Sequence, residues 1–138
     1  MKKIMTLSVF FCFLVLTAQE KTRGRIQLQI DNIANDEGQL LIGLYDSETN
    51  WLNKIYVGKV AAISNGTAAI SFENIPLGVY AISVFHDEDN NGKLKTFLGI
   101  PTESTGSSNN APARFGPPKW EDAKFTLTEK TVYQEITL

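Results

Sequence analysis

Apolar and polar side chains alternate along most of this chain, and this period of two constrains the fold more than any other feature. In residues 25–31 (RIQLQID), Ile26, Leu28 and Ile30 share one face, and two glutamines share the other. This is the pattern of a half-buried strand. No apolar period of 3.6 residues lasts for three turns beyond residue 20. The sequence therefore predicts an all-β protein.

Six further segments have strand character. They are residues 39–46, 57–63, 67–75, 78–87, 124–128 and 131–138. The first is apolar on both faces, which indicates a central strand. Asn65-Gly66 predicts a hairpin between the second and third segments, because both positions of a two-residue turn need positive φ. A tight turn at residues 129–130 joins the last two. Seven short strands predict a β-sandwich, immunoglobulin-like or transthyretin-like.

One connection is much longer than the others. It runs for 37 residues from Asp87 to Ala123 and contains four of the five prolines, whereas ordinary connections have about four to six residues. A connection of this length is either disordered or functional. Its apolar residues indicate that it packs against the sandwich; they are Phe97, Leu98, Ile100, Phe115 and Trp120.

Residues 1–19 have the pattern of a secretory signal peptide. Two lysines precede an apolar run from Ile4 to Leu16, and small residues follow it. The run is too short to span a bilayer comfortably. A buried N-terminal strand or helix is the alternative for the same residues. We expect cleavage after Ala18 or Gln19, export to the periplasm or the medium, and a single domain over residues 20–138.

Composition limits the chemistry of the exported chain. Cys12, the only cysteine, lies within the signal and lacks the small residue that precedes a lipoprotein cysteine. We therefore expect no disulfide, thiol or lipid anchor. Residues 20–138 contain 11 Lys/Arg and 15 Asp/Glu, a net charge of −4, which argues against a nucleic-acid partner. One histidine excludes a zinc site of the usual kind, and no later apolar run is long enough to cross a membrane.

The strand that ends at residue 87 runs into an acidic loop, DEDNNG. Asp87, Asp89 and Asn91 occupy alternate positions and Gly92 the sixth, as in the first half of an EF-hand calcium loop. The seventh position of such a loop, here Lys93, contributes its backbone carbonyl oxygen. The sequence therefore predicts a calcium site on a β scaffold.

The second half of the loop departs from the EF-hand pattern. Leu98 stands at the twelfth position, where an EF-hand has a bidentate glutamate. Glu103 is the first candidate for the missing carboxylate and Asp122 the second. The competing interpretation is a polar Asn-Gly turn with solvated acids. A calcium ion here should be structural, with a Kd of about 10⁻⁴–10⁻³ M, as in extracellular modules.

His86, the only histidine, precedes the acidic loop and suggests an alternative function. With the carboxylates of Asp87, Asp89 and Glu103 it would form a small hydrolase site. A histidine at a strand end is more often a packed residue. The serine pair at 107–108 lies outside a G-x-S-x-G elbow and is a weak candidate for a nucleophile.

Aromatic side chains in the connections are candidates for a binding surface. We single out Phe115 and Trp120, with His86, for contact with a ligand. A carbohydrate or protein of the cell envelope would suit such a surface, whereas plugging of the sandwich ends is the alternative. A non-catalytic binding or structural module is the leading interpretation. A third is an assembly subunit that pairs through a strand edge.

The segment Phe72–Leu127 resembles the bacterial domain of unknown function 2141 (DUF2141) family. The resemblance rests on a Pro-Gly-Tyr turn, a strand ending in His-Asp, an acidic Asn-Gly loop, LGIP-x-E, SNN and W-x-DA-x-F. Lys95 stands where the family pattern leads us to expect an acid. The resemblance implies an exported protein and no assigned activity. The F-x-N-I-P-x-G-x-Y corner is also similar to that of transthyretin-like and collagen-adhesin B-type sandwich modules.

Overall fold

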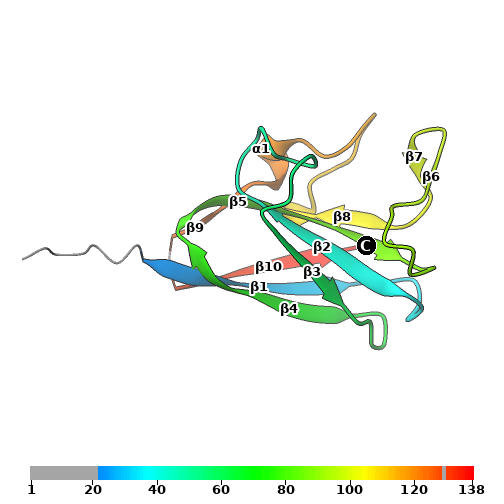
Figure 1. Ribbon diagram of the computed structural model, residues 1–138, viewed down its shortest axis with the longest axis horizontal. Coiled ribbons are helices and arrows are strands. Elements are labelled where there is room, and N and C mark those ends of the chain that lie inside the picture. The colour runs from blue at the N-terminus through cyan, green and yellow to red at the C-terminus, as the bar shows by residue number, and fades with distance from the viewer. Residues whose placement is uncertain (1–21, 129) are drawn as a thin grey trace, which may run out of the picture.

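Two β-sheets enclose one hydrophobic core in the computed structural model, which describes residues 22–128 and 130–138 (Figure 1). The strands are β1 (Arg23–Asp31), β2 (Gln39–Tyr45), β3 (Val57–Ala61), β4 (Ala68–Pro76), β5 (Gly78–Asp87), β6 (Thr96–Phe97), β7 (Ile100–Pro101), β8 (Thr105–Ser107), β9 (Phe125–Leu127) and β10 (Thr131–Thr137). A 3₁₀-helix, η1 (Ser108–Asn110), and a short helix, α1 (Trp120–Ala123), complete the elements. One sheet has the order β10-β1-β4; the other has the order β3-β2-β5-β8, with β9 also paired to β5.

The alternation of side chains explains the core. Ile26, Leu28 and Ile30 of β1 are at most 2 % exposed, and they form one cluster with apolar residues of β2, β5 and β10. Burial of each such side chain contributes about 1.5–3 kcal/mol. Each predicted strand has a counterpart, and β2 is central, between β3 and β5. The all-β prediction is confirmed.

The predicted hairpin at Asn65-Gly66 is wrong, although its turn geometry is right. Both residues have positive φ, 53° and 71°, yet β3 pairs with β2 and β4 pairs with β1. The backbone pairing between the two arms is limited, in the described chain, to the bridge between Ser64 and Thr67. The carboxylate of Asp36 accepts hydrogen bonds from both turn N–H groups, at 2.9 and 2.8 Å. The turn is thus tied to the β1–β2 loop, and its arms enter opposite sheets.

The last two strands are also neighbours in sequence but not in a sheet. β9 pairs antiparallel with β5, whereas β10 runs parallel to β1 over seven residue pairs. Parallel pairing requires a long crossover, and here nearly the whole chain provides it. The C-terminal strand therefore completes the sheet that the first strand begins.

The long connection packs only in part. It contains β6, β7, β8, η1 and α1. Trp120 is buried against Tyr45 and Ala81, as predicted. Phe97, Leu98, Ile100 and Phe115 are exposed, and the prediction that they pack is wrong. The reason is that the β6–β7 hairpin and residues 111–119 stand off from the two sheets, out of reach of the core (Figure 1).

Membrane-spanning helices are absent from the described part of the chain. The predicted signal peptide, residues 1–19, lies outside the described residues.

Candidate metal site

Strand register brings the acidic loop and Glu103 together. β5 ends at Asp87, and β8 pairs antiparallel with β5 so that Phe85 faces Thr105. The N–H of His86 donates to the carbonyl oxygen of Ser104 at 2.9 Å. The same register, continued by two residues, sets Glu103 opposite Asp87. The side chain that closes the site therefore comes from the far end of the β6–β7 excursion.

The Asp87 carboxylate organises the loop that follows it. The residue is fully buried. Its Oδ2 accepts from the N–H of Gly92 at 2.9 Å and from Nε2 of Gln39 at 2.8 Å, and its Oδ1 accepts from the N–H of Asn91 at 3.1 Å. Gly92 has φ +74°, which suits glycine at the sixth position of the loop. A hydrogen bond from the backbone N–H of the sixth position to the carboxylate of the first thus closes the loop.

The β1–β2 loop forms the back of the site. Gly38, with φ +72°, passes so close to β5 that a Cβ on it would clash with the carbonyl oxygen of Asp87. The next residue, Gln39, is the one that donates to the Asp87 carboxylate. Sequence reasoning missed Gln39. Its role follows from the pairing of Gln39 with Asp87 across β2 and β5, which the sequence pattern does not specify.

Glu103 is buried and oriented by the backbone of the loop that it closes. Its Oε2 accepts from the N–H of Lys95 at 2.8 Å, and its Oε1 accepts from the N–H of Glu88 at 3.2 Å. Carboxylate oxygens of Asp87, Asp89 and Glu103 lie within 4.8 Å of one another. These three acids form the acidic cluster. It includes the first predicted candidate, Glu103; the second, Asp122, lies on α1.

Asn91 and Lys93 follow the turn pattern of the loop. The N–H and Nδ2 of Asn91 both donate to the Asp89 carboxylate, at 3.2 Å each. Its Oδ1 accepts from the N–H of Lys93 at 2.8 Å. Lys95, which departs from the expected acid, contributes its backbone N–H to Glu103. Lys95 therefore positions a carboxylate of the site instead of supplying one.

Two opposing influences act on the pKa of the Asp87 carboxyl. Burial raises the pKa, and hydrogen bonds from Gln39, Gly92 and Asn91 lower it. The hydrogen bonds prevail, and the pKa lies below the ordinary 3.8. Asp87 is consequently ionised at neutral pH. Adjacent carboxylates repel each other, and a bound cation relieves that repulsion.

Comparison with known proteins shows the family of the chain. A family model described as an uncharacterized protein conserved in bacteria (DUF2141) matches residues 28–135, a range that contains the whole acidic loop and Glu103. The chain belongs to the DUF2141 family. Neither a curated protein nor a solved structure matches it.

The only histidine of this DUF2141 chain is a core residue. His86 is fully buried, and its Nε2 lies 2.6 Å from the carbonyl oxygen of Glu37, a contact that requires the proton on Nε2. Its Nδ1 lies 3.9 Å from Oε1 of Glu88 and has no hydrogen-bond partner among the described residues. A general base must reach the proton that it removes. The burial of His86 therefore argues against the hydrolase alternative.

The predicted ligand surface does not assemble. Phe115 is fully exposed on residues 111–119, Trp120 is buried beside Trp51, and His86 lies in the core. Ser108 is also buried; its Oγ accepts from the N–H of Ile82 at 2.9 Å and donates to the carbonyl oxygen of Ala123 at 2.6 Å. These contacts make Ser108 a structural bridge, so its hydroxyl is not free to act as a nucleophile.

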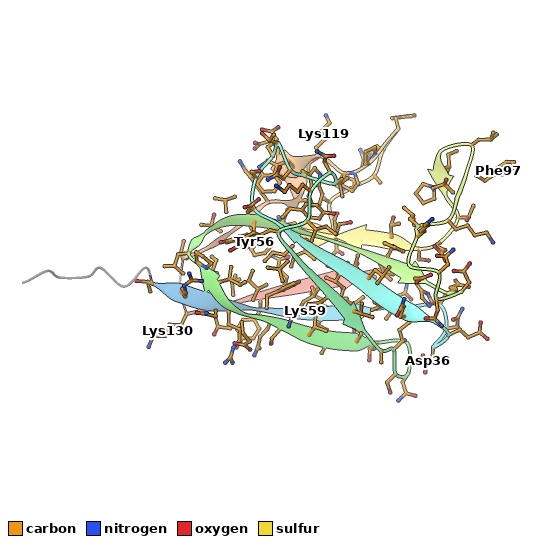
Figure 2. All side chains as sticks on the ribbon, in the orientation of Figure 1. Asp36, Tyr56, Lys59, Phe97, Lys119 and Lys130 are labelled. Carbon is orange, nitrogen blue, oxygen red and sulfur yellow. The ribbon has the colours of Figure 1, made fainter. Side chains whose placement is uncertain are left out.

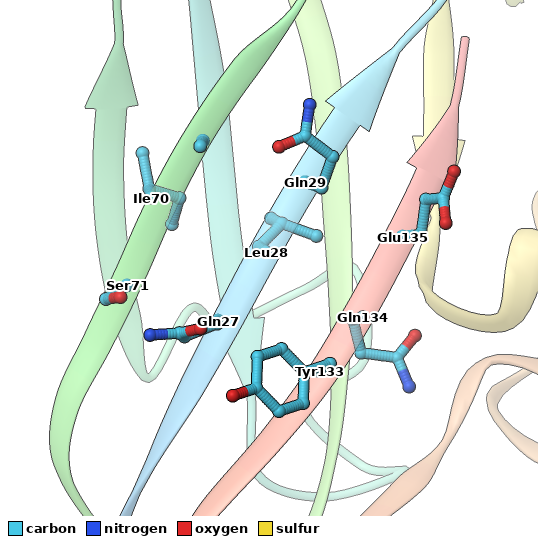
Figure 3. Close-up of a pocket in the computed structure, with 9 residues that line it drawn as sticks. Gln27, Leu28, Gln29, Ile70, Ser71, Tyr133, Gln134 and Glu135 are labelled. Atoms are coloured by element: carbon cyan, nitrogen blue, oxygen red, sulfur yellow. The ribbon is translucent and has the colours of Figure 1, made fainter.

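The structure also contains a surface groove that the sequence pattern does not predict. A shallow groove of about 640 Å³ lies on the sheet β10-β1-β4 (Figure 3). It is lined in part by Gln27 and Gln29 of β1 and by Tyr133 and Glu135 of β10. The alternation of each strand marks these positions as outward-facing. Only the parallel pairing of β1 with β10, which sets Gln27 beside Tyr133, places them together. The groove belongs to the sheet opposite the acidic cluster.

Proposed function

We propose that this protein is an exported, non-catalytic β-sandwich module whose acidic loop binds calcium. The observation that supports the proposal is the acidic cluster, in which two of the three carboxylates, those of Asp87 and Glu103, are buried. Burying adjacent charges is unfavourable unless they are paired with opposite charge or coordinate a metal. Calcium accepts six to eight oxygen ligands with flexible geometry.

The ligands would come from two segments of the chain. Asp87, Asp89 and Glu103 would supply carboxylate oxygens, Asn91 an amide oxygen and Lys93 its backbone carbonyl, with water completing the shell. The ion would tie the end of β5 to the segment before β8. Its role would be to hold both ends of the β6–β7 excursion, which is a structural role.

Calcium-dependent thermal unfolding tests the proposal. At about fifty times Kd, a ligand that binds only the folded state adds about 2 kcal/mol, which raises Tm by several degrees. We expect this rise for the wild type on exchange from EDTA into about 50 mM calcium, which is fifty times the weakest expected Kd of about 10⁻³ M. Asp89→Ala, at an exposed position, should abolish it.

Asp122→Ala is the matched control, because it removes an exposed acid on α1, and it should retain the full calcium effect. A wild-type Tm that is the same in EDTA and in about 50 mM calcium would overturn the calcium proposal.

The proposal also includes removal of residues 1–19 as a signal peptide. The remaining residues 20–138 would form one domain, a β-sandwich of immunoglobulin-like or transthyretin-like type. Two sheets around one core support the sandwich. N-terminal sequencing of the exported protein tests the cleavage site, with Gln19 or Glu20 expected first.

Pairing through a strand edge stays a prediction, to be tested by light scattering over a range of concentrations.

A further inference from the structure

Two loops of the long connection end in exposed apolar tips. In the β6–β7 hairpin, Phe97, Leu98 and Ile100 are 69 %, 87 % and 69 % exposed. In residues 111–119, Phe115 is completely exposed. Both loops project on the same side of the molecule, at the top in Figure 1, and Phe97 lies at the outer end of its hairpin (Figure 2). We call these two loops the apolar tips.

Backbone conformation adds to the exposure. Leu98 and Phe115 have φ of +50° and +56°, a left-handed conformation that is unfavourable for residues with a Cβ. Each precedes a glycine that also has positive φ, Gly99 and Gly116. Turns of this kind usually carry asparagine or glycine at such positions. A large apolar side chain there stabilises neither the turn nor the core, which points to an occupant outside the chain.

The charge near the tips is opposite to that of the protein as a whole. Residues 93–102 contain Lys93 and Lys95 and no acid, and residues 111–119 contain Arg114 and Lys119 and no acid. The complete chain has a net charge of −2. Lys119 lies on the side to which the tips project (Figure 2). Apolar side chains flanked by cations are complementary to the boundary between acyl chains and anionic headgroups.

The acidic cluster lies behind the hairpin tip. Glu103 follows Ile100 by three positions, which corresponds to at most about 10 Å of extended chain. The Debye length at physiological salt is about 8 Å. At a separation of this order, salt screens part of the negative charge of the cluster from a surface that meets the tip.

We propose that the two apolar tips dock this protein on an anionic lipid bilayer. The four apolar side chains enter the interface beneath the headgroups, while Lys95 and Arg114 contact lipid phosphates. Two separate tips with flanking cations suit a flat, fluid surface, because lipid adapts to each tip independently. A protein partner would need two apolar pockets at a matching separation.

Co-sedimentation with lipid vesicles tests the proposal. The purified protein is mixed, in EDTA at about 0.15 M salt, with vesicles of phosphatidylcholine alone or with about 30 % phosphatidylglycerol. EDTA excludes binding in which calcium bridges the acidic cluster and the lipid. We expect the wild type to bind preferentially to the anionic vesicles. In the double variant Phe97→Ser/Phe115→Ser, the partition coefficient for these vesicles should fall by about tenfold or more.

Val60→Ser is the matched control, since Val60 is an apolar residue on β3 that is 61 % exposed; it should bind as the wild type does. Thermal melts establish that each variant is folded. Two results would overturn the proposal. One is a wild type that stays in the supernatant with both kinds of vesicle, which is the result expected if the tips bind only a protein. The other is a folded double variant that sediments as well as the wild type.

Discussion

Asp87 combines several structural roles in one side chain. It ends β5, is buried, and accepts hydrogen bonds from the backbone of its own loop and from Gln39 on β2. Three donors on one carboxylate stabilise its charged form. The loop therefore has a defined conformation that depends on the ionisation of this residue.

The lowered pKa of Asp87 predicts a specific loss of stability in acid. Above pH 3.8 the carboxyl is ionised in both the folded and the unfolded chain, and its full contribution is present. As the pH falls below this value, the unfolded chain takes up the proton first, so stability declines down to the folded pKa. We expect Tm in EDTA to fall more steeply for the wild type than for Asp87→Asn between about pH 5 and pH 3.

Circular dichroism melts at a series of pH values provide the measurement. Asp87→Asn should have the lower Tm at neutral pH, because the amide cannot accept all three hydrogen bonds as an ionised carboxylate does. Asp122→Asn serves as the control and should follow the wild type. Parallel pH curves for the wild type and Asp87→Asn would contradict the role assigned to Asp87.

Among the elements, the segment Ser108–Asn110 joins the two sheets. Ser108 binds β5 and α1, the N–H of Asn109 donates to the Gln134 side chain at 3.1 Å, and Oδ1 of Asn110 accepts from the N–H of Thr137 at 2.9 Å. Asn109 and Asn110 both have positive φ, which asparagine tolerates better than most residues. This SNN segment thus fixes the long connection between β5 and β10.

Replacing Ser108 by alanine tests this bridge. The change leaves the buried N–H of Ile82 and the carbonyl oxygen of Ala123 without the Oγ that bonds both. Two unsatisfied groups cost about 2–6 kcal/mol in the free energy of unfolding, measured by urea titration. Ser104→Ala, in the same connection, should change it by less than about 0.5 kcal/mol. Equal effects of the two variants would contradict the bridge.

The elements show what can be predicted from the sequence and what cannot. The period of two is local, so strands such as β1 and β5 and their buried faces follow from it. The D-x-D-x-N-G loop is local as well, and the structure places Glu103, the first candidate for the missing acid, beside Asp87 and Asp89. Strand partners depend on contacts between distant residues, and this is why the hairpin at Asn65-Gly66 failed and Gln39 was missed. The exposure of Phe115 could not be predicted, because a sequence pattern is interpreted on the assumption that large apolar side chains are buried.

At the scale of the whole molecule, closure of the core depends on the last residues of the chain. β10 pairs with β1 over seven residues, Ile136 is fully buried in the shared core, and the N–H of Leu138 donates to the carbonyl oxygen of Asp31 at 3.0 Å. β1 is central only while β10 is in place. Without β10, β1 would present an unpaired edge above an open core.

Deletion of residues 131–138 should therefore prevent cooperative folding. The shortened chain loses the Ile136 side chain from the core and exposes the edge of β1, which favours association between chains. We expect a broad thermal transition and concentration-dependent aggregates by size-exclusion chromatography.

A synthetic peptide of residues 130–138, added in excess, should restore a sharp transition by occupying the vacant edge. The same peptide with Ile136→Ser should restore less. A shortened chain that stays monomeric and melts like the wild type would show that the core closes without β10.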